Sequence, residues 1–308
     1  MKKHRTRVLG ASLLMVSLLG VACGGDGETG TTAPVEGPGI VIGAQDFGES
    51  AILAEIYKGA LERAGYAATV QAVGGFRDLE LAAFEAGDIN LAPEYAASML
   101  EFLNEKAGEA TGDAAETTSL LNGYLTDLGL VALTPSDAVN TNAFVVTSET
   151  AESAGLATLS DLASNGADLV LGGPPDCETN PFCIPGLNTV YGIDMSGNFQ
   201  PLDAGQVTVA ALEAGEIDVA ILFSTSGIIA DKGWVLLEDD QGMLAADNVV
   251  PVLTTELQAA YGDDLVAVLN DISSKLTTAS LTEMNKRFDI DTEDAEAIAA
   301  DWLADNGF

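Results

Sequence analysis

The sequence predicts an α/β fold with mostly parallel sheets, and three observations support this prediction. From residue 39 onward, short apolar runs alternate with amphipathic runs of helix length, which is the pattern of strands joined by crossover helices. One helix-and-strand stretch recurs later in the chain with a similar sequence. The composition is globular, with 47% apolar residues among 308, a length that suits one large domain or two smaller ones.

The predicted elements follow one another in a regular order. The first strand, 39–44, is the apolar run GIVIGA, and the helix at 50–65 is amphipathic and ends near Gly65, since glycine commonly ends helices. A strand at 66–73 and a helix at 77–87 repeat this pattern. Further strands are predicted at 142–150, 167–173, 217–223 and 249–253. After residue 253 the sequence is almost purely helical in pattern, so the chain should end on one or two packing helices.

An internal repeat links two distant segments. Residues 82–98 and 210–226 are identical at 8 of 17 positions, and each reads as a helix, a glycine, an acidic turn and a strand. Such units resemble one another in any α/β protein, which is the alternative explanation. A real repeat implies two similar lobes, each with an aromatic residue, Tyr95 or Phe223, at the carboxyl end of a strand, where open α/β sheets bind ligands.

The charge balance excludes several classes of function. The formal net charge is −35, from 47 acidic and 12 basic residues, so phosphate backbones and anionic membrane surfaces are unfavourable partners. The only histidine is His4, and no nucleophile elbow or phosphate-binding glycine loop fits its required context. Asp239, Asp240 and Asp247 lack the spacing of a calcium loop. We therefore expect no enzyme activity, no cofactor, no metal and no nucleic-acid partner.

The first 22 residues are predicted to be a signal peptide. A basic start and a 15-residue apolar stretch precede small residues and Cys23, a layout that resembles a bacterial lipoprotein signal, in which this cysteine is acylated. The alternative is an ordinary cleaved signal with a free Cys23. Loss of 1–22 removes His4 and four basic residues, leaving a net charge of −39. Residues 23–38 read as a flexible tether, which places the body outside the cell membrane on a lipid anchor.

Two further cysteines, Cys177 and Cys183, lie six residues apart in a proline-rich loop. In an exported protein such a pair predicts a disulfide. A metal site would need further histidine or cysteine ligands, which this body lacks.

Candidate binding residues gather where predicted strands meet helices. Gln45 and Phe47 lie at the first such turn, where backbone N–H groups point outward. Arg77 starts the second helix and is one of few basic residues in the body, so it is a candidate for a ligand carboxylate. The alternative is that Arg77 pairs with Asp78, Glu80 or another nearby acid.

Motifs in a fixed order resemble a known family. The segments GAQDFGESAILAEIYKGALERAGY, GGFRDLELAAFEAGDINLAPEYAASML, LGGPPDCETNPFCIPGLNTVYGI, PLDAGQVTVAALEAGEIDVAILFSTSGIIADKGWVLLEDD and AADNVVPVL resemble the substrate-binding proteins of ABC importers for glycine betaine, choline and related osmoprotectants. The similarity runs from about residue 39 to about residue 304. It implies a type II periplasmic-binding-protein fold with two lobes, 39–140 plus 249–308 and 141–248, and crossovers near 137–142 and 247–250.

The resemblance also implies which residues form the ligand cage. Family ligands carry a trimethylammonium group, which aromatic faces attract. Tyr95, in the Pro-Glu-Tyr motif, carries over as a cage residue. Phe223 stands where many members have tyrosine, and Thr225 follows it in the same motif. Asn142 falls where some members have another cage tyrosine, and Phe47 matches a family aromatic residue near the first turn, although a core role is an equal alternative.

The resulting functional expectation is a monomeric, membrane-tethered binding protein. It captures a quaternary amine or zwitterion of the glycine betaine, choline or carnitine type and delivers it to an ABC permease, with no covalent chemistry. One alternative is a ligand-sensing domain for a different small amine or amino-acid-like solute, such as ergothioneine, that signals to a membrane partner. Another is a hydrolase or lyase on the same scaffold, against which the absence of histidine counts.

Overall fold

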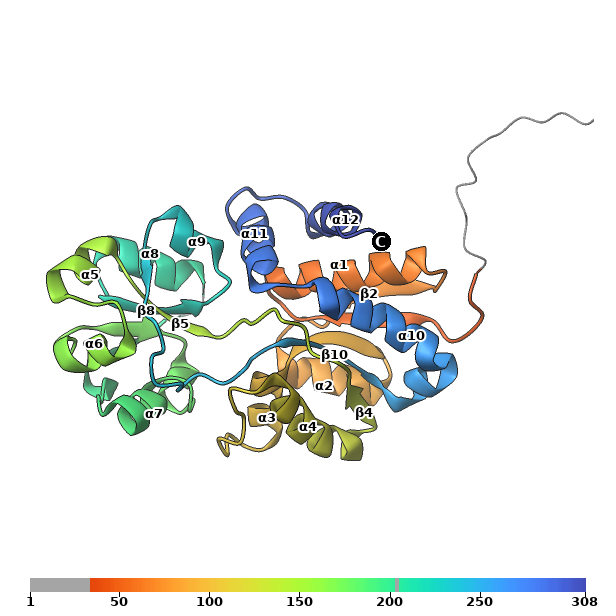
Figure 1. The fold of residues 1–308 in the computed structure, drawn as a ribbon, viewed down its shortest axis with the longest axis horizontal. Helices are drawn as coiled ribbons and strands as arrows, with labels where there is room; N and C mark the ends of the chain where they lie inside the picture. Colours follow the sequence, from red (N-terminus) through yellow and green to blue (C-terminus); the bar gives the residue numbers. More distant parts are fainter. Residues whose placement is uncertain (1–33, 203–204) are drawn as a thin grey trace, which may run out of the picture. The chain divides into compact units, whose positions relative to one another are not determined.

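The computed structural model describes residues 34–202 and 205–308 (Figure 1). The predicted signal peptide, Cys23 and the tether up to residue 33 lie outside the described residues. Residues 34–38 do not form a helix or strand, but they contact the body: the Val35 N–H donates to the Gly65 carbonyl, and the Tyr261 hydroxyl donates to the Pro38 carbonyl. Within the described chain, no helix combines the length and the apolar character needed to cross a membrane.

Two five-stranded sheets organise the fold, and they share one topology. The first has the order β2 (Ala68–Ala72), β1 (Ile40–Ala44), β3 (Leu91–Tyr95), β10 (Val249–Thr254) and β4 (Leu130–Ala132). The second has the order β7 (Phe199–Pro201), β6 (Leu171–Gly173), β8 (Val219–Phe223), β5 (Asn142–Val146) and β9 (Val235–Leu236). The chain passes between the sheets twice, from β4 to β5 and from β9 to β10.

Strand directions follow from these passages. β1 is parallel to β2 and β3, whereas β10 is antiparallel to both of its neighbours. The second sheet repeats this, with β6 parallel to β7 and β8 and with β5 antiparallel to its neighbours. In each sheet the antiparallel strand, β10 or β5, is the first strand after the chain has crossed from the other sheet. It therefore enters its sheet from the opposite end. The predicted α/β fold is confirmed, but its sheets are mixed, since two of the four strand pairings in each sheet are antiparallel.

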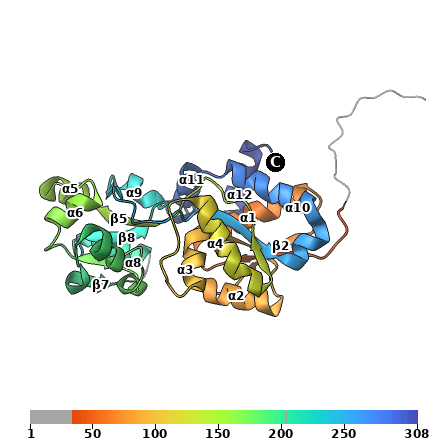
Figure 2. The same cartoon turned by 60° about the horizontal axis from the view of Figure 1, so that its bottom comes forward.

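Helices cover both faces of each sheet because strand side chains alternate between the faces. In β10, Val249 and Leu253 pack in one apolar cluster while Val250 and Val252 pack in another. The first cluster is completed by α1 (Gly48–Arg63), α10 (Thr255–Lys275), α11 (Thr278–Asp289) and α12 (Ala295–Asp305). The second is completed by α2 (Arg77–Ala86), α3 (Ala96–Leu103) and α4 (Ala114–Leu125), which Figure 2 brings into view.

The second sheet is covered in the same way. Phe144 and Val146 of β5 pack in a cluster with α6, whereas Ala143 and Val145 pack in a cluster with α8 and α9. The helices here are α5 (Ser148–Ala154), α6 (Leu159–Asn165), α7 (Ile184–Gly186), α8 (Gln206–Ala214) and α9 (Gly227–Asp231). Short 3₁₀ turns occur at Thr126–Leu128, Pro175–Glu178 and Ser196–Asn198, and a π-helical turn at Leu187–Tyr191.

Some predicted element bounds were wrong. The strand predicted at 142–150 ends at Val146, because the Thr147 hydroxyl accepts a hydrogen bond from the Thr150 N–H and caps α5, as threonine commonly does at a helix start. Three helices, α10 to α12, follow the last strand, where one or two were predicted. The short strands β4, β7 and β9 were not predicted, since two or three residues carry no readable alternation.

The internal repeat coincides with equivalent parts of the two sheets. Its first copy covers the end of α2 and β3, and its second covers the end of α8 and β8. β3 and β8 hold the same position in the two sheet orders. Gly87 and Gly215 end the two helices with φ of 75° and 68°, a left-handed conformation that favours glycine. Tyr95 and Phe223 are the final residues of the two strands.

Close packing between α9 and α11 yields the first prediction. A methyl group placed on Gly227 would lie 2.5 Å from Lys286 Cβ and 2.8 Å from Lys286 Cα, so backbone must move to admit it. We expect Gly227→Ala to lower the free energy of unfolding by about 1–3 kcal/mol, measured by urea denaturation. The control is Gly197→Ala, where nothing lies within 4 Å; equal stability of the two variants would contradict this packing.

Candidate ligand-binding site

Three aromatic side chains cluster at the carboxyl edge of the first sheet. Phe47 precedes α1, Phe76 precedes α2, and Tyr95 ends β3. The ring centroid of Phe47 lies 6.1 Å from that of Tyr95 and 6.5 Å from that of Phe76. Tyr95 is buried, Phe47 is partly buried and Phe76 is 60% exposed. The cluster therefore runs from the interior to an open aromatic surface at the edge where α/β sheets bind ligands.

A buried carboxylate, Glu49, holds the inner end of this cluster. Glu49 Oε1 accepts hydrogen bonds from the Tyr95 hydroxyl at 2.6 Å and from Asn140 Nδ2 at 2.8 Å. Glu49 Oε2 accepts from the Thr225 hydroxyl at 2.7 Å and from Asn285 Nδ2. The donors come from β3, from the first passage between the sheets, from the segment after β8 and from α11. One carboxylate thus fixes the Tyr95 ring relative to both sheets.

The environment of Tyr95 opposes ionisation of its hydroxyl. Burial raises its pKa well above the ordinary value, and the nearby charge and hydrogen bond of Glu49 raise it further. Glu94 and Asp247 act in the same direction. The hydroxyl therefore stays protonated and donates to Glu49, leaving the aromatic ring as the part that a ligand can use.

A second buried network lies beside the first. Arg77 Nε and Nη2 donate to the two carboxylate oxygens of Glu94 at 2.8 and 2.7 Å. Gln45 Nε2 donates to Glu94 Oε1 at 3.0 Å and to Glu80 Oε2 at 3.2 Å, and the Tyr95 N–H donates to Glu94 Oε2. A two-point pair of this kind fixes both partners in orientation. The network thereby fixes three side chains relative to one another: Gln45 directly after β1, Arg77 at the start of α2 and Tyr95 at the end of β3.

The pKa values of the two glutamates in this network shift in opposite directions. Burial raises the pKa of Glu80, and the adjacent Glu94 charge raises it further. Burial acts on Glu94 too, but the charge and hydrogen bonds of Arg77 outweigh it and lower the Glu94 pKa. Two like charges in one buried site cannot both ionise cheaply. Arg77 therefore favours the charged form of Glu94, and burial beside that charge favours the protonated form of Glu80.

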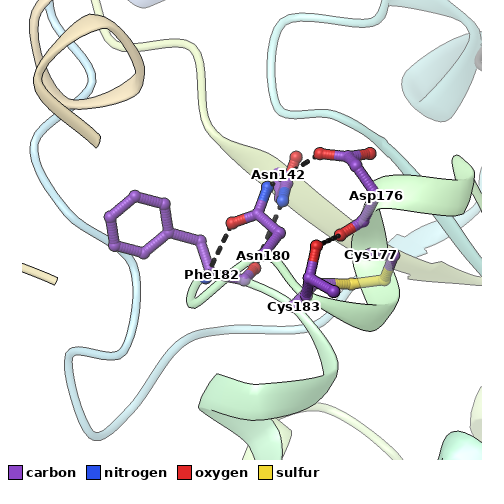
Figure 3. The surroundings of a disulfide bond; sticks show 7 residues. Asn142, Asp176, Cys177, Asn180, Phe182 and Cys183 are labelled. Atoms are coloured by element: carbon purple, nitrogen blue, oxygen red, sulfur yellow. Dashed lines mark hydrogen bonds between the residues drawn. A yellow bond between two sulfur atoms is a disulfide. The ribbon is translucent and has the colours of Figure 1, made fainter. Parts of the chain in front are cut away.

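The second sheet contributes Asn142 and Phe223. They are cross-strand partners in the antiparallel pair β5 and β8, and Phe223 is 42% exposed. Asn142 Nδ2 donates to the Phe182 carbonyl at 3.2 Å. This contact joins β5 to the loop that the Cys177–Cys183 disulfide closes. Figure 3 shows the Phe182 ring directed away from the disulfide. The predicted cystine pairing is present, and its loop is fastened to a predicted site residue.

A small pocket lies between α3 and the second sheet. Its lining includes Ser98 of α3, Asn142, Phe182 and Asp247. Asp247 is buried, and its carboxylate accepts hydrogen bonds from the Ser98 N–H and hydroxyl. Burial raises the pKa of Asp247 to about 6, against the opposing effect of Ser98. A larger hollow between α1 and α12 contains none of the predicted binding residues, whereas the small pocket contains Asn142.

The structure brings most predicted residues into connected groups. Phe47 and Tyr95 touch, Gln45 and Arg77 share Glu94, and Thr225 reaches Tyr95 through Glu49. Arg77 pairs with a nearby acid, as the alternative had it, but this acid is the buried Glu94 and not a surface carboxylate. No described contact joins Tyr95 to Phe223. The ligand-binding roles of the seven residues stay predictions.

Sequence reasoning missed several residues of these networks. The sequence could have indicated Glu94, because a charged residue inside a strand predicted to be buried requires a partner. It could also have indicated Phe76, since this residue directly precedes Arg77 at the predicted turn. Glu49 and Asn140 lie in ordinary helix-start and linker contexts, and Asn285 lies on a polar helix far along the chain, so nothing local marks them. Among the described residues, no group of histidine, cysteine or carboxylate side chains is arranged to hold a metal ion.

Two similar sheets, two passages between them and an aromatic edge define a two-lobed solute-binding protein with the type II periplasmic-binding-protein fold. Residues 38–305 match the family described as the substrate-binding domain of ABC-type glycine betaine transport systems. Because this match spans most of the chain, the protein belongs to that family of transport substrate-binding domains.

Individual proteins show the same likeness. A glycine-betaine-binding protein of Pseudomonas aeruginosa is 27% identical over 275 residues, covering 86% of this chain and 87% of that protein. The glycine betaine-binding protein YehZ of Escherichia coli is 23% identical over 279 residues, covering 87% and 91%. A solved structure described as a glycine betaine/carnitine/choline ABC transporter superposes with a TM-score of 0.74 at 25% identity, covering 86% of this chain and 98% of that one.

The buried Asp247 predicts a distinct pH dependence of stability. Its folded-state pKa of about 6 lies above the ordinary 3.8, so the folded protein binds this proton more tightly than the unfolded chain does. Its contribution to stability is present below about pH 4 and is lost as the pH rises through 6. Asp247→Asn retains the Ser98 contacts but cannot ionise.

We expect the free energy of unfolding of Asp247→Asn, relative to the unmodified protein, to rise by about 2 kcal/mol between pH 4 and pH 7. Urea denaturation at both pH values measures this difference. A constant difference across that range would show that Asp247 is not perturbed.

Proposed function

We propose that this protein captures a small quaternary ammonium compound or related zwitterion of the glycine betaine, choline or carnitine type and delivers it to an ABC permease. The observation that carries the proposal is the aromatic cluster of Phe47, Phe76 and Tyr95 at the carboxyl edge of the first sheet. Membership in the transport family supports the permease as partner.

The physical basis is the attraction between a cation and aromatic faces. A trimethylammonium group cannot donate a conventional hydrogen bond, so ring faces are the groups that bind it without a desolvation penalty of their own. Tyr95 is held immobile by Glu49, which reduces the ordering cost of binding. Phe223 at the equivalent edge of the second sheet is exposed, and we propose that it completes the cage from the other side.

The proposal extends to lobe closure. We assign residues 39–140 and 249–308 to one lobe and 141–248 to the other, with ligand held between them. Binding energy then draws the lobes together, and the closed form presents the surface that the permease recognises. Gln45, Asn142 and Thr225 supply polar contacts at the lobe edges. No covalent step, cofactor or nucleic acid takes part, and the protein acts as a monomer.

We also propose an extracytoplasmic location with a lipid anchor. The family serves ABC importers, whose substrate-binding proteins work outside the cytoplasm. Removal of residues 1–22 and acylation of Cys23 would attach the body to the outer face of the cell membrane. Mass spectrometry of the protein purified from its native membrane tests this: a diacylated or triacylated Cys23 is expected, and an unmodified thiol there would contradict it.

Isothermal titration calorimetry is the direct test of function. Glycine betaine, choline, carnitine, proline betaine and ergothioneine are titrated into the purified protein, and at least one quaternary amine is expected to bind. Circular dichroism on the same sample establishes that it is folded. Failure of all five ligands with a folded protein would reject the proposed function while leaving the fold intact.

The cage role of Tyr95 has its own prediction. Tyr95→Ala removes the ring, and we expect affinity to fall at least about thirtyfold, since a desolvated cation–π contact contributes about 2 kcal/mol. Tyr95→Phe keeps the ring but loses the hydrogen bond to Glu49, so its affinity should fall less. Tyr124→Ala, on the surface of α4, is the control and should bind normally. Unchanged affinity in Tyr95→Ala would place the site elsewhere.

A further inference from the structure

Buried acidic groups contact Tyr95 at its hydroxyl and at its backbone N–H. Glu49 accepts the hydrogen bond from its hydroxyl, Glu94 accepts one from its N–H, and Asp247 lies close enough to act on its electrostatics. All three carboxylates are buried. In the interior such charges are screened far less than they are in water. The field at the ring therefore favours an incoming positive charge and opposes an incoming negative one.

The basic group among these acids is already engaged. Arg77 places two of its donors on Glu94 and acts on Asp247 only through its charge; among the described residues, the ion pair of Arg77 is with Glu94 and not with Glu49 or Asp247. Four other basic side chains of the described chain are bound to acids on the surface: Lys58 to Glu55, Lys232 to Glu213, Lys275 to Asp271 and Arg287 to Glu293. Lys106 donates to the Thr179 hydroxyl. A ligand carboxylate that entered beside Tyr95 would meet a local excess of negative charge.

The amide side chains also use their donors within the protein. Gln45 Nε2 donates to Glu80 and Glu94, Asn140 Nδ2 to Glu49, and Asn142 Nδ2 to the Phe182 carbonyl. Gln45 thereby uses both of its N–H donors and retains its carbonyl oxygen for a ligand, whereas Asn140 and Asn142 each use one N–H in these contacts. Asn140 Oδ1 is buried and has no hydrogen-bond partner. Acceptors suit a cation or a ligand hydroxyl and repel a carboxylate.

We propose that the site selects a net-cationic amine that carries a hydroxyl or other hydrogen-bond donor, in preference to a zwitterion that carries a carboxylate. This inference rests on the proposed function and concerns the same site. It follows from the Glu49, Glu94 and Asp247 carboxylates near Tyr95, from the engagement of Arg77 by Glu94, and from the buried Asn140 Oδ1, an acceptor without a hydrogen-bond partner.

Choline and glycine betaine separate the two classes, because they share a trimethylammonium group and differ in a hydroxymethyl versus a carboxylate. We expect choline to bind the purified full chain roughly ten- to a hundredfold more tightly at pH 7.5 in calorimetry, from the repulsion of one added charge at a distance of several ångströms. The uncharged choline analogue 3,3-dimethylbutan-1-ol should not bind measurably. Raising NaCl from 50 to 500 mM should weaken choline binding more than glycine betaine binding.

Asp247→Asn tests the origin of the preference. This variant removes one buried charge but keeps the contacts with Ser98, and it should reduce the ratio of choline to glycine betaine affinity several-fold. The matched control is Asp168→Asn, which removes an exposed charge ahead of β6, at the opposite edge of the second sheet, and should leave the ratio unchanged.

The outcomes distinguish this inference from the proposed function. Glycine betaine binding as tightly as choline, or more tightly, would overturn the charge preference and leave the proposed function in place. Equal ratios in Asp247→Asn and Asp168→Asn would also overturn it, because the buried carboxylate would then not set the selectivity. Failure of every quaternary amine to bind would reject the proposed function, and the preference would fall with it.

Discussion

The Glu49 carboxylate is the constraint on which the arrangement of the site depends. Its four hydrogen-bond donors lie between 46 and 236 residues away along the chain. A buried carboxylate is tolerated only when its oxygens are well paired. Satisfying it therefore requires β3, the first passage between the sheets, the segment after β8 and α11 to arrive at one point. The same four contacts orient Tyr95 and connect it to Thr225 of the other sheet.

A second network fixes side chains at the edge of the first sheet. It consists of Arg77, Glu94, Glu80 and Gln45. Glu94 alternates with Tyr95 along β3, so the two side chains leave opposite faces of the strand. Arg77 balances the charge of Glu94 and lowers its pKa, whereas burial and the neighbouring Glu94 charge raise the pKa of Glu80. These contacts consume the hydrogen-bond donors of Gln45. The polarity of the site is thus set by groups that lie behind the aromatic surface.

Much of this protein was predictable from local patterns. Apolar runs and helix periodicity located β1, β2, β8, β10, α1 and α2, because buried faces impose regular spacing on the sequence. The repeat of 82–98 at 210–226 located two equivalent strands, and both end on the aromatic residues singled out in advance. Strand ends and helix starts were less certain, as at Thr147, where a capping hydrogen bond outweighs the β propensity of the preceding valines.

The sequence by itself determined the fold class, the pairing of Cys177 with Cys183, and the candidacy of Tyr95, Phe223 and Gln45, since these depend on local periodicity, spacing and motif. Tertiary structure alone decided that Glu49 joins both sheets, that Arg77 is engaged by Glu94, and that Phe76 extends the aromatic surface. Those contacts depend on which distant hydrogen-bond donors the folded chain brings next to a buried charge. No local pattern encodes such pairings, because the partners become neighbours only when the two sheets form.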